Sequence, residues 1–139
     1  ITAAETGHLV FATLHTISAS AAIDRIIDVF PPHQQAQIRT QLADTVLSVM
    51  AQQLIPKKNG KGRVCALEVL MGSYAAKSLI REGKTFQLET VMQTSVKDGM
   101  ILMDQSLKDL LKKGEISGKE AFHRASNKKQ FAEFIKRGF

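Results

Sequence analysis

Apolar residues in the first half of the chain follow one extended pattern and two helical ones. Residues 8–15 form a short, nearly continuous apolar run, which is typical of a strand buried on both faces of a parallel sheet. A helix is predicted next, with Ser18 or Ser20 as its cap and an apolar face that ends at two prolines. The spacing then predicts a long helix over residues 33–53. Its apolar stripe consists of Ile38, Leu42, Val46, Val49 and Met50.

A β-hairpin is predicted in the middle of the chain. Residues 53–56 and 63–71 favour strands, and the six residues between them are polar and include two glycines. A helix is predicted over residues 73–82, with Gly83 as its terminator.

From residue 84 onward the pattern is helical throughout and indicates four short helices. One is predicted over residues 104–113, where Asp104 precedes Lys108 by four residues, a spacing that suits an ion pair. The tetrapeptide SGKE at residues 117–120 fits a capping box before another helix. This change of pattern predicts a mixed α/β part over residues 1–83 and a helical part over residues 84–139.

Composition fits a folded domain and excludes wholesale disorder. The 139 residues are 44% hydrophobic and 23% charged, which is ordinary for a globular chain. No apolar run approaches the ~18 residues of a membrane-spanning helix. Cys65 is the single cysteine and cannot form an internal disulfide, which suits a reducing cytoplasm. The chain opens at Ile1 in what resembles the last turns of a helix, so we expect it to be part of a longer protein.

The net charge is +6, from 19 Lys and Arg against 13 Asp and Glu. It is uneven: residues 1–30 carry −2, whereas residues 31–83 and 84–139 each carry +4. Such a surface suits phosphates, nucleic acid or an acidic partner, or is simply solvated. Basic residues do not alternate with aromatic ones, and Trp is absent, so the stacking expected of a single-stranded RNA-binding module is not predicted.

Two histidines flank the predicted first strand and are the first candidates for chemistry. Seven residues at about 3.3 Å each separate His8 from His15 by roughly 23 Å, on opposite faces, so the pair cannot share a metal ion. Ligands gather at the carboxyl ends of parallel strands, which favours His15, with Thr13 and Thr16, beside a bound phosphate. A purely structural role is the alternative for a lone histidine.

Two further segments carry charge without a recognisable motif. Arg81-Glu82 at a helix end suits a surface ion pair. The turn over residues 57–63 has four basic residues, which fit either a phosphate contact or a solvated loop. No G-x-x-x-x-G-K-[ST] phosphate-binding loop, zinc-finger spacing or catalytic-triad pattern occurs, and no metal site is predicted.

Beyond spacing, four segments resemble a known family. TGHLVFATLHT at residues 6–16 resembles the histidine box of the type II/type IV secretion ATPase superfamily, and residues 23–31 continue in register with it. SLIREGKT at residues 78–85 resembles a motif of pilus-retraction ATPases of the twitching-motility (PilT) type, as do residues 99–107. The likeness covers essentially the whole chain.

The resemblance implies an α/β fold, the C-terminal part of a RecA-like P-loop ATPase core followed by a helical C-terminal subdomain. It implies ATP and Mg²⁺ as cofactors, with the P-loop and the Walker B glutamate outside this chain. His8 and His15 take the histidine-box role, His15 with Thr13 and Thr16 on the ATP phosphates. The retraction-coupling role falls on Leu79, Ile80, Arg81 and Glu82. The preceding AAKS departs from the family's Ala-Ile-Arg-Asn.

The resemblance further implies a homohexamer that powers pilus retraction together with an inner-membrane platform protein. It implies a cytoplasmic location, peripheral at the inner-membrane face, and no specific nucleic acid. We expect this chain alone to be inactive. Two alternatives stay open: a non-catalytic interaction module derived from such an ATPase, and a basic nucleic-acid binder, whose affinity for DNA should fall steeply with salt.

Overall fold

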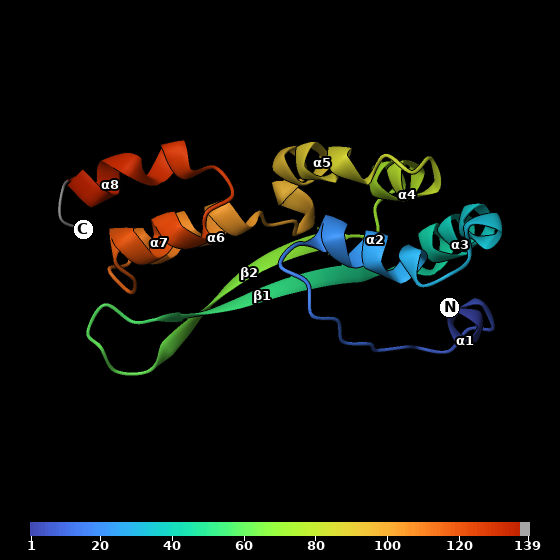
Figure 1. The fold of residues 1–139 in the computed structure, drawn as a ribbon, viewed down its shortest axis with the longest axis horizontal. Helices are drawn as coiled ribbons and strands as arrows, with labels where there is room; N and C mark the ends of the chain where they lie inside the picture. The colour runs from blue at the N-terminus through green and yellow to red at the C-terminus, as the bar shows by residue number, and fades with distance from the viewer. Residues whose placement is uncertain (137–139) are drawn as a thin grey trace. The chain divides into compact units, whose positions relative to one another are not determined.

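A computed structural model describes residues 1–136, in which short helices accompany a two-stranded sheet of order β1-β2 (Figure 1). The elements run in this order: α1 (Thr2–Glu5), α2 (Ala19–Asp28), α3 (Pro32–Thr45), β1 (Ser48–Pro56), β2 (Arg63–Met71), α4 (Tyr74–Arg81), η1 (Thr85–Gln87), α5 (Leu88–Thr94), η2 (Val96–Asp98), α6 (Met103–Lys112), α7 (Gly118–Arg124), η3 (Lys128–Phe131) and α8 (Ala132–Lys136).

These elements form two compact units. Unit 1 consists of Ile1–Ala51 and Val69–Met100, and unit 2 consists of Gln52–Glu68 and the chain from Ile101 onward, so each strand of the hairpin contributes to both. The predicted boundary after residue 83 does not coincide with this division, because the segment after α4 packs within unit 1. There the Thr85 hydroxyl donates to Asp24 Oδ1 at 2.8 Å, and Leu88 is fully buried.

The histidine-flanked segment is not a strand in this structure, so that prediction is wrong. Residues 8–16 belong to no strand or helix, and residues 8–15 are all exposed, with Phe11 88% accessible. A buried parallel strand needs hydrogen-bonded neighbours. In the described chain the strands β1 and β2 pair with each other, and neither pairs with this segment.

The long helix predicted over residues 33–53 ends early, and its second half is β1. Helix α3 ends at Thr45, and Val46 is already extended, with φ −64° and ψ 126°. Val49 and Met50, placed on the helical stripe by their spacing, lie in β1 instead. The β-branched residues here suit a pleated strand, and the pairing with β2 supplies the backbone hydrogen bonds.

The predicted hairpin is confirmed, and two backbone contacts fix its register. Lys57 N–H donates to Gly62 O at 3.1 Å beside the turn, and Gly72 N–H donates to Leu47 O at 2.8 Å at the open end. Both contacts fit one antiparallel register without a bulge. Alternate residues therefore share a face, and the inward set includes Ala51, Ile55, Ala66, Glu68 and Leu70.

Serine caps begin three of the helices, and those at Ser18 and Ser117 are as the sequence predicts. The Ser18 hydroxyl accepts from Ala21 N–H at 3.2 Å at the start of α2. Ser73 does the same for α4 and Ser117 for α7. Each cap satisfies a backbone donor that the first turn of a helix leaves unpaired.

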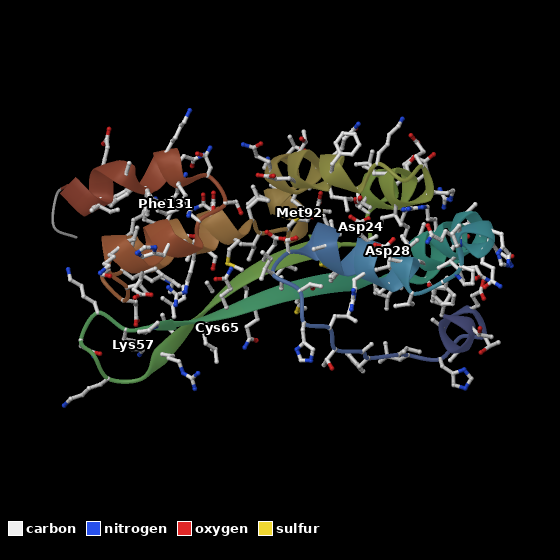
Figure 2. All side chains as sticks on the ribbon, viewed as in Figure 1. Asp24, Asp28, Lys57, Cys65, Met92 and Phe131 are labelled. Atoms are coloured by element: carbon white, nitrogen blue, oxygen red, sulfur yellow. The ribbon has the colours of Figure 1, made fainter. Side chains whose placement is uncertain are left out.

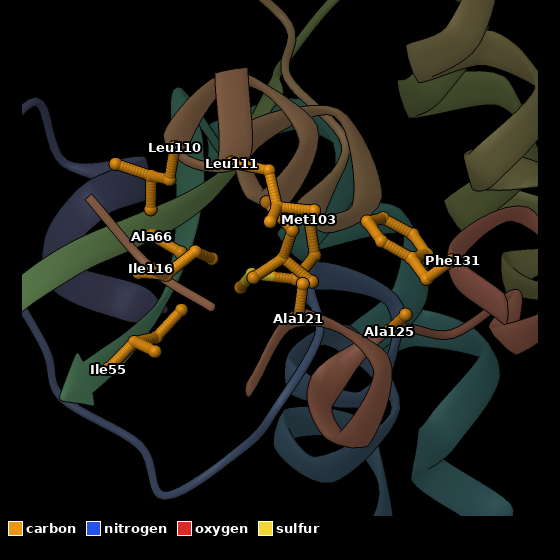
Figure 3. Packing of buried hydrophobic residues seen from close by; sticks show 10 residues of the cluster. Ile55, Ala66, Met103, Leu110, Leu111, Ile116, Ala121, Ala125 and Phe131 are labelled. Atoms are coloured by element: carbon orange, nitrogen blue, oxygen red, sulfur yellow. The ribbon is translucent and has the colours of Figure 1, made fainter. Parts of the chain in front are cut away.

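The core of unit 2 joins one end of the hairpin to the C-terminal helices (Figure 3). Ile55 and Ala66 of the hairpin pack with Leu107, Ile116 and Phe131, all of them buried. Removing the Ile, Leu and Phe side chains of this set from water contributes about 1.5–3 kcal/mol each.

The predicted ion pair between Asp104 and Lys108 does not form. The Asp104 carboxylate instead accepts from the backbone N–H groups of Ser126 and Asn127 at 2.8 and 2.9 Å. Lys108 turns to the side-chain oxygen of Gln130. The exposed ion pair is not formed because two hydrogen bonds from backbone N–H groups stabilise the carboxylate more than one solvated lysine does.

Candidate functional site

The first candidate residue, His8, is bound back to the end of α1. Its Nδ1 lies 3.0 Å from Thr6 Oγ1 and 3.2 Å from Ala3 O. Gly7, with φ +92°, makes the turn that brings the ring back. The ring is exposed, and its partners are local, so His8 fixes the start of the extended segment.

The second histidine lies at the other end of the segment and is presented to solvent. His15 and Thr13 are exposed, and Thr16 is half-buried just before the Ser18 cap of α2. Among residues 1–136, no protein group hydrogen-bonds the His15 ring. The structure thus places His8 and His15 with different surroundings, and it leaves the His15 nitrogens accessible to a ligand.

The donor set around His15 suits phosphate oxygens. An imidazole and two hydroxyls can donate hydrogen bonds to an anion. Mg²⁺ prefers carboxylate and other oxygen ligands. No group of three or more His, Cys, Asp or Glu side chains that could hold a metal ion occurs within residues 1–136. The residues therefore fit the phosphate end of a nucleotide.

The third candidate, the segment 79–82 at the end of α4, is anchored on α3. Ile80 is fully buried and Leu79 is half-buried. Arg81 Nη2 lies 2.6 Å from Asp44 Oδ1. Lys77, one helical turn earlier, donates from Nζ to the backbone oxygen of Asp44 at 3.0 Å.

Glu82 is held by residues of its own segment. Lys84 Nζ donates to Oε2 at 2.8 Å, and the Ser78 hydroxyl donates to Oε1 at 3.0 Å. The hydrogen bond from Lys84, then that from Ser78, together with the charge of Lys84, lower the pKa of Glu82 below its ordinary value. Glu82 is therefore ionised at neutral pH.

Helix α3 contacts α1, which precedes the histidine segment, and the end of α4, and the sequence alone shows neither contact. Near its middle, Gln41 Nε2 donates to Glu5 Oε2 of α1 at 3.0 Å, and one turn later Asp44 binds Arg81. These partners lie 36 and 37 residues apart in the chain. No local motif signals such pairs. Within the described chain, Arg39 Nη1 of the same helix is buried without a hydrogen-bond partner.

No helix in the part of the chain that the structure describes has the length and apolar character needed to span a membrane.

The sequence matches a family model described as "Type II/IV secretion system protein" over residues 1–135. The type IV pilus retraction ATPase PilT of Pseudomonas aeruginosa is 47% identical over 131 residues, which cover 94% of this chain and 38% of that protein. A twitching motility protein of Neisseria gonorrhoeae is 45% identical over 127 residues, covering 91% of this chain and 34% of that protein. The chain thus spans about a third of the length of these relatives.

Solved structures give the same picture for the fold. The pilus retraction motor PilT with bound ADP superposes with a TM-score of 0.81 at 42% identity, over 93% of this chain and 36% of that chain. The ATPase DotB of Yersinia pseudotuberculosis superposes with a TM-score of 0.74 at 28% identity, over 88% of this chain and 32% of that chain. These likenesses confirm the predicted fold class, the C-terminal part of a RecA-like ATPase core with a helical C-terminal region.

Proposed function

Because the chain belongs to the type II/IV secretion system protein family, we propose that it is the C-terminal part of a motor ATPase that couples ATP hydrolysis to type IV pilus retraction. The observation that carries the proposal is the 47% identity with a pilus retraction ATPase across 94% of the chain. The family match spans residues 1–135, which include both candidate segments.

In this proposal His15, Thr13 and Thr16 contact the nucleotide's phosphates, and ATP supplies the phosphoryl group that is transferred to water. The accessible His15 ring acts as a hydrogen-bond donor that senses the terminal phosphate. His8 belongs to the same segment but positions it, since its Nδ1 contacts Thr6 and Ala3. The Mg²⁺ ligands, the P-loop and the Walker B glutamate belong to the remainder of the full-length protein.

We assign the coupling role to the segment from Leu79 to Glu82. Ile80 is fully buried and anchors the segment in unit 1, and Leu79 is half-buried. The charged groups of Arg81 and Glu82 are exposed. Asp44 pairs with Arg81, and Ser78 and Lys84 donate hydrogen bonds to Glu82. Because Ile80 is buried and both charged side chains are held by hydrogen bonds, a movement of α4 would carry Arg81 and Glu82 with it and could be passed to a surface that they contact.

The full-length protein is proposed to assemble as a homohexamer and to act with an inner-membrane platform protein. Its proposed location is the cytoplasm, at the face of the inner membrane. The present chain alone is proposed to be inactive. ATP turnover by purified residues 1–139, free of contaminating enzymes, would contradict this.

The test uses the full-length protein in its own host. It should hydrolyse ATP, and its deletion should abolish pilus retraction and leave pili extended. The alternative, a non-catalytic interaction module, predicts no turnover and a reading frame without a P-loop. Sequencing the gene upstream of Ile1, together with the turnover measurement, decides between the two.

A further inference from the structure

The excess positive charge of the chain belongs almost entirely to unit 2. Its sequence, residues 52–68 and 101–139, contains thirteen Lys and Arg against six Asp and Glu, a net charge of +7. Unit 1 contains six against seven, a net charge of −1, and the two values account for the total of +6. The asymmetry follows the structural units and is not visible as a single run in the sequence.

Within unit 2, two turns contact each other, and these turns and the residues beside them carry six cations. Lys58 N–H donates to Glu115 O at 2.8 Å, and Lys57 Nζ lies 3.6 Å from the Glu115 carboxylate. The hairpin turn therefore contacts the turn between α6 and α7, and Figure 2 shows Lys57 at this end of the hairpin. We call the resulting surface the tip patch. It consists of Lys57, Lys58, Lys61, Arg63, Lys112 and Lys113.

The tip patch is open to a ligand. Five of its six side chains are exposed, and Lys57 is half-buried. Of its six side chains, only that of Lys57 pairs with a carboxylate of the described residues, that of Glu115. The turn itself is held by uncharged groups, since the side-chain Oδ1 of Asn59 accepts from Lys61 N–H at 2.9 Å and two glycines adopt positive φ. The conformation of the turn therefore does not depend on ion pairs made by these cations, and the cations remain available to an anionic surface.

The composition of the tip patch selects among anionic partners. It contains five lysines, one arginine and no aromatic residue. Protein interfaces are depleted in lysine and depend on Trp, Tyr and Arg anchors. Single-stranded nucleic acid is bound through aromatic stacking. Clustered lysines without anchors suit the diffuse negative charge of lipid headgroups, which they attract without a defined pocket.

We propose that the tip patch is a docking surface for a bilayer that contains anionic lipids. The proposal deepens the membrane-side location given under the proposed function and rests on it. It does not depend on nucleotide hydrolysis. It assigns a role to the hairpin turn and to the α6–α7 turn, neither of which takes part in the proposed motor activity.

The experiment measures partition of the full-length protein onto sucrose-loaded vesicles by sedimentation. One set contains 30% phosphatidylglycerol in phosphatidylcholine, and the other contains phosphatidylcholine alone. The variant K58Q/K61Q neutralises two lysines of the tip patch. The matched control K97Q/K129Q neutralises two exposed lysines outside it, one in each unit.

We expect binding to the anionic vesicles only, lost at high salt. The partition coefficient of K58Q/K61Q should fall about 30-fold, as expected when two surface lysines leave an anionic bilayer, and that of K97Q/K129Q should change less than about 2-fold. Sodium phosphate should displace the protein no more than sodium chloride of equal ionic strength, because the ligand is a surface and not a free anion.

Equal binding by K58Q/K61Q and the wild type would overturn the proposal and leave the membrane-side location standing. Absence of binding to the anionic vesicles would also overturn the proposal, and the membrane-side location would then depend on the platform protein alone. If K58Q/K61Q instead lost affinity for duplex DNA or for an acidic protein, with vesicle binding unaffected, the occupant would be wrong. ATP turnover measured on the same preparations keeps these outcomes separate from a failure of the motor assignment.

Discussion

Asp44 of α3 receives two cations of α4: the Arg81 guanidinium lies 2.6 Å from its carboxylate, and Lys77 donates to its backbone oxygen at 3.0 Å. The arginine and the carboxylate are both about half exposed, so the pair contributes little to global stability. Its effect is instead on orientation, because two points of contact fix the end of α4 on the end of α3. The same α3 contacts Glu5 of α1 through Gln41.

Asp44 therefore offers a test of the coupling segment. In the full-length protein, Arg81→Ala with Glu82→Ala should leave ATP hydrolysis within about 2-fold of the wild type while pilus retraction fails. Asp44→Asn should weaken retraction in the same direction but less. Retraction is measured by fluorescence microscopy of labelled pili, and turnover by phosphate release.

The charge-reversed pair Asp44→Arg with Arg81→Asp separates positioning from direct contact. Recovery of retraction would show that the pair orients α4, whereas no recovery would show that Arg81 itself touches a partner. Asp98→Asn, at an exposed carboxylate of unit 1, is the matched control and should behave like the wild type. A collapse of ATP turnover in the Arg81 and Glu82 variant would contradict the coupling role.

His15 gives a second prediction, on catalysis. His15→Ala in the full-length protein should lower kcat about 10- to 150-fold, since the loss of a hydrogen bond to a charged group costs about 1.5–3 kcal/mol. Nucleotide affinity, measured with a fluorescent ADP analogue, should change much less. His8→Ala should perturb both quantities only mildly, because its ring contacts Thr6 and Ala3. Equal losses of affinity and kcat for His15→Ala would contradict a sensor role.

The sequence predicts the elements whose signals are local and misses those that depend on distant partners. Ser18 and Ser117 cap helices as expected, because a cap needs only the next three residues. Residues 8–15 have the composition of a buried strand, yet they remain unpaired, because pairing depends on neighbours that the composition does not contain. The contact of Asp44 with Arg81 likewise could not be predicted, since neither local sequence contains a signal that identifies the other residue as its partner.

Packing in unit 2 gives a third prediction, on stability. Phe131→Ala should lower the local free energy of unfolding by about 3–5 kcal/mol, because the ring is fully buried and its removal leaves a cavity. Phe86→Ala removes the same side chain from a site that is 77% exposed and should change it by less than about 0.5 kcal/mol. Hydrogen exchange of the Leu107 amide, in the same core, reports the difference. Similar protection in the two variants would contradict the core assignment.

The last prediction concerns the ionisation of Glu82. Its pKa is lowered in the folded state, chiefly by Lys84 and then by Ser78. The stabilisation it confers is therefore complete above its ordinary value of 4.5 and is lost as the pH falls through the folded-state pKa. Lys84→Gln should raise the pKa of Glu82 towards 4.5, Ser78→Ala should raise it less, and Lys97→Gln, which leaves both donors in place, should not move it. A carbon-13 titration of the Glu82 carboxyl measures each value, and an unchanged pKa in Lys84→Gln would show that the hydrogen bond from Lys84 does not persist in solution.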